Sequence, residues 1–187
     1  TAIAKNSWSY TDNNDFKKAK DILCDLVDVV SKNGSMLLNV GPKADGTFSE
    51  EDTAVLREIG AWLKANGEAV YGSKVWRIAA EGPTESVEGQ FTDAKDKVFT
   101  AEDFRFTTGH GAIYAAALCY PENGEILIRS MRSGSEKNPA MMGADITKVS
   151  VLGFEEAPRW SRNEEGLHIQ TDTVHTDQPV VFKIEVL

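Results

Sequence analysis

The side chains of this sequence best suited to hold a ligand are two aromatic rings and one amide. Trp8 and Tyr10 stand close together in the short polar stretch 1–12, and an aromatic ring near a strand end can form a platform for the apolar face of a sugar. Trp8 fits equally well as a residue packed beneath the helix that follows. Asn39 lies near the end of the apolar run 36–40, where its amide either faces a site or only caps the strand. The residues alone leave both questions open.

Patterns for other common chemistries are missing from the sequence. His110, His168 and His175 lack the i, i+4 spacing of a helical zinc site, and Cys24 and Cys119 lack metal-ligand spacing. There is no nucleophile elbow, P-loop or dinucleotide-binding fingerprint. Carboxylates are plentiful, and a pair of them can hydrolyse a glycoside, but nothing local singles a pair out. The sequence therefore predicts no metal or cofactor, two free buried thiols, and no identifiable catalytic residue.

The elements around Asn39 are predicted to be a strand, a polar loop and a covering helix. The run 36–40 is nearly all apolar, as expected of a strand buried on both faces of a parallel sheet. Ser49 is a good helix N-cap, and the three acidic residues after it favour the positive end of the helix. Gly67 is expected to end this helix. In α/β folds the loop after such a strand lies at the carboxyl end of the sheet, where active sites are built.

A second helix is predicted over 15–33, where apolar residues recur on one face. The resulting order of helix, strand and helix is the repeat of an α/β unit. Only one clear strand is present, and one strand with two helices cannot close a parallel sheet. The neighbouring strands must come from elsewhere, and without them the segment has an unpaired sheet edge.

From Trp76 onward the sequence shows no helical period. Short runs rich in β-branched and aromatic residues, bounded by turn signals, predict about seven strands of an antiparallel β-sandwich. The expected strands are 104–108, 112–120, 125–131, 147–152, 159–161, 167–170 and 180–186. The turns 121–124 and 163–166 are each expected to join their flanking strands as a hairpin. The chain thus divides into an α/β segment, 1–72, and an all-β domain, 73–187.

The composition excludes two classes of partner. The formal net charge is −9 and the isoelectric point is about 4.9, which argues against binding to nucleic acid or to an anionic membrane. No apolar run approaches the roughly 20 residues of a membrane span, and no signal peptide is visible. The sequence begins at Thr1 rather than Met, which indicates a processed product or a fragment. Two cysteines leave the redox compartment undetermined.

Seven motifs in a fixed order carry a family resemblance. They are S-W-S-Y at 7–10, L-V-D-V-V-S-K-N-G at 26–34, L-L-N-V-G-P-K-A-D-G at 37–46, L-R-E-I-G-A-W-L-K-A-N-G-E-A-V-Y-G at 56–72, D-F-R-F-T-T at 103–108, V-L-G-F at 151–154 and G-L-H-I-Q at 166–170. On these residues, over nearly its whole length, the chain resembles the C-terminal part of the α-L-fucosidase family of glycoside hydrolases.

The resemblance implies a fold and an activity. The α/β segment looks like the last segment of a (β/α)₈ barrel, followed by the antiparallel β-sandwich of the family. Family members hydrolyse terminal α-L-fucosides with retention of configuration, which requires two carboxylates and no metal. Both carboxylates of the family lie upstream of Thr1, so no catalytic residue is assigned here. The implied partners are a fucosylated glycan and the missing N-terminal part of the barrel, and an oligomer is compatible with the sequence.

Two residues inherit a substrate-binding expectation from the resemblance. Trp8 matches a position on a loop of the active face, and Asn39 matches the end of the final barrel strand. Ser9 departs from the family, which usually has Gly there, and this change affects the loop that carries Trp8. Fucosidases commonly act outside the cytosol, so the resemblance favours a secreted, periplasmic or lysosomal-type compartment.

Two alternatives to an enzyme fragment follow from the sandwich. It could be a non-catalytic carbohydrate-binding module, which requires an exposed row of aromatic residues on one sheet face. Trp76 and Trp160 are the only tryptophans of the sandwich region, and both are expected to be buried at junctions. The second alternative is that the sandwich is a structural domain that packs on the barrel. This role is compatible with the fucosidase hypothesis. The 187 residues by themselves are predicted to be inactive.

Overall fold

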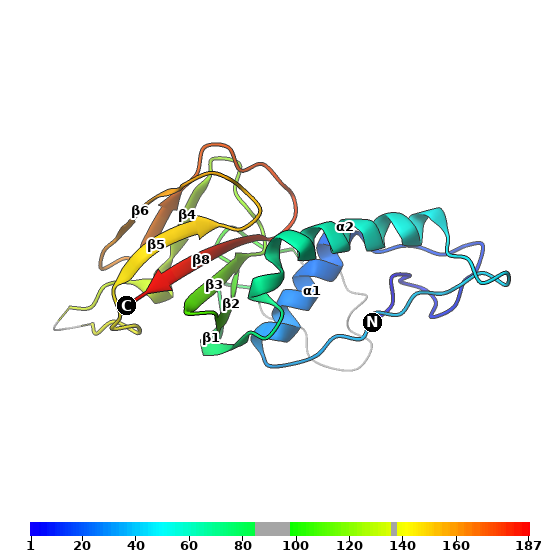
Figure 1. Cartoon of the computed structure of the whole chain (residues 1–187), viewed down its shortest axis with the longest axis horizontal. Helices are drawn as coiled ribbons and strands as arrows, with labels where there is room; N and C mark the ends of the chain where they lie inside the picture. The colour runs from blue at the N-terminus through cyan, green and yellow to red at the C-terminus, as the bar shows by residue number, and fades with distance from the viewer. Residues whose placement is uncertain (85–97, 136–137) are drawn as a thin grey trace.

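A computed structural model describes residues 1–84, 98–135 and 138–187 of the chain. In this part of the chain two β-sheets pack face to face, and two helices lie beside the larger sheet (Figure 1). The helices are α1 (Ala19–Ser31) and α2 (Glu50–Asn66), and the short 3₁₀ turns are η1 (Gly67–Ala69) and η2 (Arg129–Met131). The strands are β1 (Lys74–Glu81), β2 (Phe104–Gly109), β3 (Ala112–Ala117), β4 (Glu125–Ile128), β5 (Ile146–Val151), β6 (Arg159–Arg162), β7 (Leu167–Gln170) and β8 (Val180–Val186).

The β-strands form the antiparallel sandwich that the sequence predicts. The larger sheet has the order β1-β2-β3-β8-β5 and the smaller has the order β4-β7-β6. Each neighbouring pair in the two sheets is antiparallel. The hairpin predicted across 163–166 is confirmed, because Arg162 of β6 pairs with Leu167 of β7. Strand β1, which the turn signals do not reveal, adds an edge to the larger sheet.

The turn 121–124 joins two different sheets, so the hairpin predicted across it is wrong. Strand β3 pairs with β2 and β8, whereas β4 pairs with β7. The turn is held against the end of β7, because the Thr171 amide donates to the Gly124 carbonyl at 3.1 Å. Gly124 has a φ of +69°, and a Cβ there would lie 2.2 Å from the Thr171 carbonyl oxygen. An Asn-Gly pair therefore marks a tight turn here without returning the chain into the same sheet.

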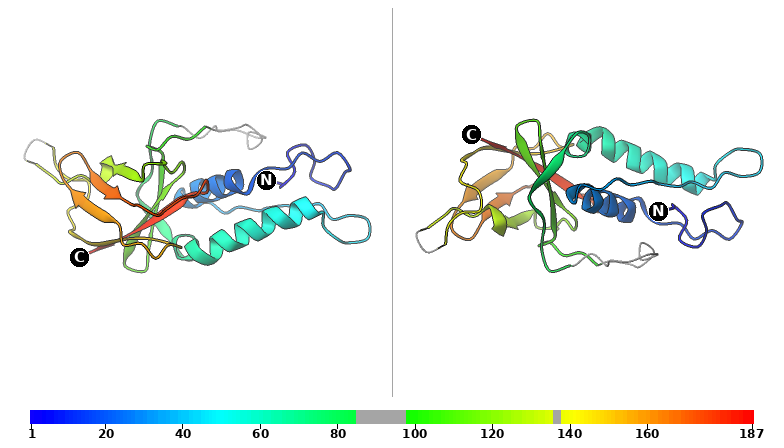
Figure 2. Two further views of the ribbon diagram at one scale, coloured as in Figure 1. Left: turned by 90° about the horizontal axis from the view of Figure 1, so that it is seen from above. Right: turned by 90° about the horizontal axis from the view of Figure 1, so that it is seen from below.

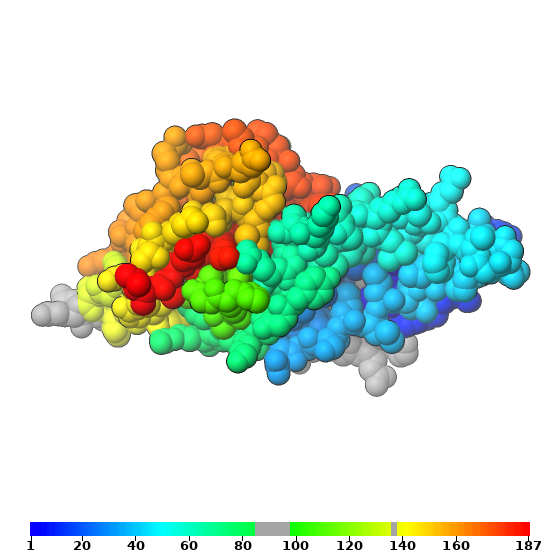
Figure 3. Space-filling model, in the orientation of Figure 1, coloured from blue at the N-terminus to red at the C-terminus, as the bar shows by residue number. Residues whose placement is uncertain are grey.

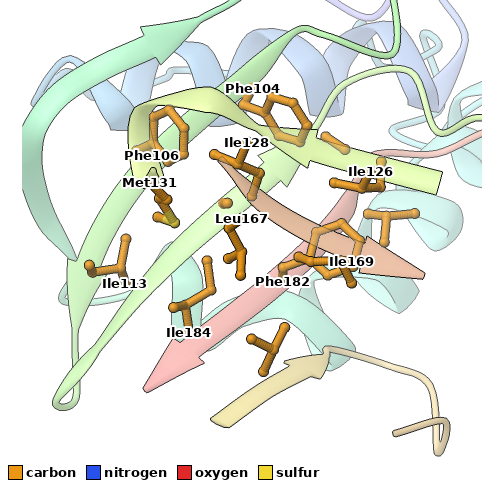
Figure 4. Packing of buried hydrophobic residues seen from close by; sticks show 14 of the residues in the cluster. Phe104, Phe106, Ile113, Ile126, Ile128, Met131, Leu167, Ile169, Phe182 and Ile184 are labelled. Atoms are coloured by element: carbon orange, nitrogen blue, oxygen red, sulfur yellow. The ribbon is translucent and has the colours of Figure 1, made fainter. Parts of the chain in front are cut away.

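The core between the two sheets is made by side chains that alternate along each strand. Phe104, Phe106 and Phe182 of the larger sheet meet Ile128 and Leu167 of the smaller sheet, and all five are fully buried (Figure 4). Residues on alternate positions of a strand point to the same face. Because of this period of two, the strands of the sandwich can be predicted from the sequence.

The opposite face of the larger sheet is also buried, because α1 and α2 cover it. Tyr114, Ala116 and Val181 on this face join a second core with Leu23 of α1 and Trp62 of α2. All six residues of β3 are consequently buried. Alanines on the outer face leave room for the helices to approach the strand closely.

The helix boundaries follow local backbone chemistry. Helix α1 begins at Ala19 and not near residue 15, because Phe16 pairs with Ala4 in an antiparallel bridge that keeps the chain extended. The predicted N-cap of α2 is confirmed, since the Ser49 hydroxyl accepts a 3.0 Å bond from the Asp52 amide. Helix α2 ends at Asn66, directly before Gly67, as predicted, but Gly67 does not have the left-handed conformation of a C′ glycine. It has a φ of −60° and continues into η1.

The N-terminal segment projects away from the sandwich. Both views in Figure 2 place the loop after the N-terminus beside the loop that precedes α2, at the end of the molecule opposite the smaller sheet. In the space-filling view the visible face of this end is made mainly by the cyan atoms of α2 and of the loop before it, with dark blue N-terminal atoms behind them (Figure 3). Among the described residues, neither helix combines the length and apolar character required to cross a membrane.

Candidate functional site

Two extended segments run side by side in the projecting part of the chain. Ala2 and Asn39 form a parallel bridge. The Asn39 amide donates to the Thr1 carbonyl at 2.9 Å, and the Ile3 amide donates to the Asn39 carbonyl at 3.1 Å. Pairing is limited to this bridge, so 36–40 is a short extended segment and not a full strand. Because the two segments are parallel, the loops that follow them emerge at the same end.

Hydrophobic alternation orients the second of these segments. Met36, Leu38 and Val40 pack against the core shared with the helices. Leu37 lies on the other side of the backbone and is 78% exposed. Asn39 is two residues after Leu37, so its side chain lies on the same side of the extended segment as Leu37. The amide is therefore presented on the side of the segment that faces away from the helices.

The structure brings the two predicted site residues together. The Asn39 side-chain amide Nδ2 donates a 2.7 Å hydrogen bond to the backbone carbonyl oxygen of Trp8. The indole of Trp8 takes no part in this bond, and the residue as a whole is 58% exposed. The alternative in which Trp8 packs beneath the following helix is therefore wrong. Substrate binding by Trp8 and Asn39 stays a prediction.

The loop that carries Trp8 is closed at its base. The Asn6 amide Nδ2 donates to the Asn13 carbonyl at 2.8 Å, and the Asn6 carbonyl oxygen Oδ1 accepts from the Asp15 amide at 3.0 Å. The Lys5 amide also donates to the Asp15 carbonyl at 2.7 Å. These bonds join the two ends of the loop. The loop is thus a defined structural unit and not an open tail.

The loop 41–48 lies against the first loop. The ammonium of Lys43 sits 5.5 Å from the ring centre of Tyr10, within the range of a cation–π contact. The predicted turn at Asp45 is confirmed, since its carboxylate accepts bonds from the Thr47 amide at 3.0 Å and the Thr47 hydroxyl at 2.7 Å. These bonds lower the pKa of Asp45. This carboxylate has a structural role that accounts for its position.

The other carboxylates with shifted pKa values, Asp28, Asp103 and Glu156, also serve the fold. Bonds from the Thr173 hydroxyl and from the Asp172 and Thr173 amides lower the pKa of Glu156. Burial acts to raise the pKa of Asp28, but hydrogen bonds and charge from Lys32 and Arg105 outweigh it, so the pKa is lowered. Burial likewise acts to raise the pKa of Asp103, and bonds from Thr100 and Thr84 bring it down. Among the described residues, the carboxylates with shifted pKa values thus do not include a matched acid and base beside Trp8.

The cysteines and histidines show no arrangement for chemistry in the described part of the chain. Cys24 and Cys119 are free thiols, and burial raises the pKa of Cys24 to about 12. Cys119 is half-buried, so the expectation of two buried thiols holds for Cys24 alone. His168 faces outward from β7, as its alternation with Leu167 and Ile169 predicts. No three potential metal ligands gather among the described residues.

A second candidate surface, which the sequence does not reveal, lies on the outer face of the smaller sheet. It is a shallow hollow of about 610 Å³. The side chains that line it from the outer face are Glu125, Leu127, Arg159, Ser161, His168 and Gln170. They are mostly polar, and they meet only because β4, β7 and β6 are neighbours. Their distance apart in the chain hides this grouping from sequence patterns.

The expectation that both sandwich tryptophans are buried is wrong. Trp76 is half-buried, and its ring centre lies 5.0 Å from that of Phe106 in the core. Trp160 is 36% exposed. It pairs with the inward-facing Ile169, but β6 is an edge strand and leaves one flank of the indole without a neighbouring strand. One half-exposed ring does not make the aromatic row of a carbohydrate-binding face.

Known proteins match this chain along its length. Residues 1–68 match the family model described as alpha-L-fucosidase, and residues 96–185 match the model described as the alpha-L-fucosidase C-terminal domain. Human tissue alpha-L-fucosidase is 33% identical over 173 residues, which cover 90% of this chain and 31% of that protein. Human plasma alpha-L-fucosidase is 31% identical over 179 residues, which cover 92% and 33%.

A solved structure supports the same comparison. The Thermotoga maritima alpha-fucosidase in complex with fucose superposes with a TM-score of 0.72 at 25% identity. The match covers 98% of this chain and 38% of that chain. The chain therefore spans about a third of the length of the relatives it matches.

Proposed function

Because this chain belongs to the α-L-fucosidase family, we propose that it is the C-terminal portion of a glycoside hydrolase that removes terminal α-L-fucose with retention of configuration. Its fold is the end of a (β/α)₈ barrel followed by an antiparallel β-sandwich. We place the boundary between the two parts at residues 72 and 73. The substrate is a fucosylated glycan, and the partner of the segment 1–72 is the N-terminal part of the same barrel.

The observation that carries the proposal is the order of the two family matches. The match to the fucosidase model ends at residue 68, and the match to the C-terminal domain runs from residue 96 to 185. A sandwich alone supports many unrelated functions. Here the end of a barrel precedes a sandwich, and together they are about one third identical in sequence to fucosidases. This combination restricts the possible functions much more than a sandwich does.

Retention requires two carboxylates about 5 Å apart, one as nucleophile and one as acid and base. In the described residues, Asp28, Asp45 and Asp103 are each engaged by protein donors or cations. The chain matches the C-terminal domain model and covers 31% of human tissue alpha-L-fucosidase, so we assign the catalytic pair to the portion of the barrel that precedes Thr1. The role proposed for this chain is on the substrate side, where the exposed indole of Trp8 offers a flat apolar surface to a sugar ring.

The sandwich is proposed to hold the last barrel helices in place. The indole nitrogen of Trp62 on α2 donates a 2.8 Å bond to the Pro179 carbonyl beside β8. The ammonium of Lys183 on β8 pairs with the Glu68 carboxylate in η1 at 2.8 Å. The Trp62 bond is buried and the Lys183–Glu68 pair is partly buried, and hydrogen bonds of both kinds are directional. They fix the orientation of α2, and through it the loop 41–48, relative to the sheet.

A second candidate function is carbohydrate binding by the sandwich. The observation in its favour is the hollow on β4, β7 and β6, which polar side chains including His168 and Gln170 line. Titration of the protein with a fucosylated oligosaccharide, in the parent and in His168→Ala, tests it. Binding that survives with unchanged affinity in His168→Ala and is lost in Trp8→Ala would assign the sugar to the barrel end alone.

The primary proposal is tested on the intact polypeptide that contains these residues. We expect it to release nitrophenol from 4-nitrophenyl α-L-fucoside, and the 187-residue chain alone to release none. Proton NMR of the first-formed sugar should show the α-anomer, because two successive inversions retain configuration. The 4-nitrophenyl β-D-galactoside serves as the control for specificity. A first-formed β-anomer would contradict retention, and an intact protein inert toward α-fucosides would contradict the activity.

A further inference from the structure

The bond between Asn39 and the loop that carries Trp8 acts on the backbone and leaves the indole free. Asn39 Nδ2 lies 2.7 Å from the Trp8 carbonyl oxygen, and Trp8 as a whole residue is 58% exposed. A side-chain donor that holds a carbonyl fixes the plane of the peptide unit to which it belongs, here the unit that joins Trp8 to Ser9, and the Trp8 Cα lies in that plane. The bond therefore restrains the backbone from which the Trp8 ring projects, and Asn39 can act on the ring through that backbone.

Contacts beside this bond hold the same two stretches together. A Cβ on Gly41 would lie 2.5 Å from the Tyr10 amide nitrogen and 2.7 Å from the Ser9 carbonyl carbon, so the backbones touch there. The ammonium of Lys43 lies over the ring of Tyr10. Residues 39, 41 and 43 thus each contact a residue of the stretch 8–10. The end of the second extended segment acts as a support for the first loop.

We propose that Asn39 is a positioning residue that sets the orientation of the Trp8 indole, and that it acts on the sugar through Trp8 and not by direct contact. The proposal rests on the proposed function, in which Trp8 forms the substrate platform. It assigns different roles to the two predicted site residues. Trp8 supplies the binding surface, and Asn39 supplies the hydrogen bond that orders it.

The chemistry of the bond explains why an amide is required. The Trp8 carbonyl is an acceptor, so its partner must donate, and the Asn39 amide nitrogen has two hydrogens to offer. Asp at this position has almost the same shape, but its carboxylate at neutral pH only accepts and would face the carbonyl with like partial charge. Asn39→Asp should therefore disturb the loop more than Asn39→Ala, which removes the donor without adding repulsion.

The first test follows the Trp8 ring without any sugar. The emission of Trp8 in the intact protein is isolated as the difference between the parent and Trp8→Phe. The same difference is then taken in the Asn39→Asp background. We expect Asn39→Asp to change the emission maximum and the acrylamide quenching of this Trp8 component. Asn123→Asp, in an exposed turn of the sandwich, is the matched control and should leave the component unchanged.

The second test is a double-mutant cycle with 4-nitrophenyl α-L-fucoside. We expect Asn39→Ala to raise KM about tenfold, since a lost hydrogen bond of this kind corresponds to roughly that factor. The increase should follow the pattern of Trp8→Ala, with kcat changed less than KM. In the Trp8→Ala background, Asn39→Ala should add little, because the ring that it positions is gone. Circular dichroism of each variant checks that the fold is retained.

The two tests separate the failure of this proposal from the failure of the proposed function. An unchanged Trp8 component in Asn39→Asp overturns the positioning role whatever the activity. Independent, multiplying losses in the cycle overturn it too, because they indicate direct contact between Asn39 and the sugar. A changed Trp8 component in a protein that cleaves no α-fucoside would support the structural coupling and reject the fucosidase assignment on which its function rests.

Discussion

The guanidinium of Arg105 on β2 forms a buried ion pair with the carboxylate of Asp28 on α1. The Arg105 side chain is only 2% exposed, and Lys32 binds the same carboxylate from the helix at 2.9 Å. Burying a charge is costly unless a partner compensates it. This pair therefore fixes where α1 lies on the sheet, because other positions would leave a charge without its partner.

Removing one member of this pair should destabilise the protein strongly. Asp28→Ala is expected to lower the free energy of unfolding by about 3–5 kcal/mol, since the Arg105 guanidinium stays buried without its carboxylate. Urea denaturation followed by circular dichroism measures the loss. Lys32→Ala is the matched control, because the Lys32 side chain is 44% exposed and its removal should cost about 1 kcal/mol or less. Equal losses in the two variants would contradict the dominant role of Arg105.

The same carboxylate predicts how stability depends on pH. Burial acts to raise the pKa of Asp28, but Lys32 and Arg105 outweigh it, and the folded pKa lies below the usual 3.8. A group with a lowered folded pKa contributes stability above its unfolded pKa and loses that contribution as the pH falls through the folded pKa. The melting temperature should therefore decrease as the pH is lowered below about 4. Asp28→Asn should flatten this dependence, and the slope that remains should include Asp103, whose pKa is also lowered.

The parts of the fold that depend on local chemistry could be predicted from the sequence. The Ser49 cap, the turn at Asp45 and the pairing of β6 with β7 each involve residues that are close in the chain. The path at 121–124 could not, because the partner that holds Gly124 is Thr171, almost fifty residues later. A turn motif fixes the bend, whereas long-range packing decides which sheet the next strand joins.

The candidate site shows the same division between local and long-range information. The types of Trp8 and Asn39 and their places beside two extended segments could be predicted. Their direct bond could not, because it depends on the parallel pairing of Ala2 with Asn39. The hollow on the smaller sheet could not be predicted either, because it also depends on long-range strand pairing. Its residues come from three strands that are separated in the chain.

The contact between α2 and the sheet gives a third prediction. Trp62 is 5% exposed, and its indole nitrogen donates to the Pro179 carbonyl at 2.8 Å. Trp62→Phe keeps an aromatic ring but removes the donor and some volume, so we expect a loss of about 2–3 kcal/mol in unfolding free energy. Trp160→Phe, on an edge strand and 36% exposed, should cost under about 1 kcal/mol. Chemical denaturation of both variants makes the comparison.

Two glycines of the α/β segment should respond to alanine in opposite directions. A Cβ on Gly41 would meet backbone atoms of Ser9 and Tyr10 at 2.5–2.7 Å, distances that require the loop to move. Gly41→Ala should therefore lower the melting temperature and change Trp8 fluorescence. Gly60 lies inside α2, and a Cβ there meets nothing within 4 Å. Gly60→Ala should stabilise the helix by about 0.5–1 kcal/mol, because alanine loses less backbone entropy there.

Calorimetry and tryptophan emission, measured together on the two glycine variants, test this reasoning. Gly60→Ala should raise the melting temperature without changing Trp8 emission, since α2 gains stability and the loop is untouched. A normal melting temperature and normal emission in Gly41→Ala would mean that the loop accepts a methyl group between 41 and 9–10. That result would mean that the close backbone contact does not explain why residue 41 is a glycine. It would leave the Asn39 bond as the support on which the orientation of Trp8 depends.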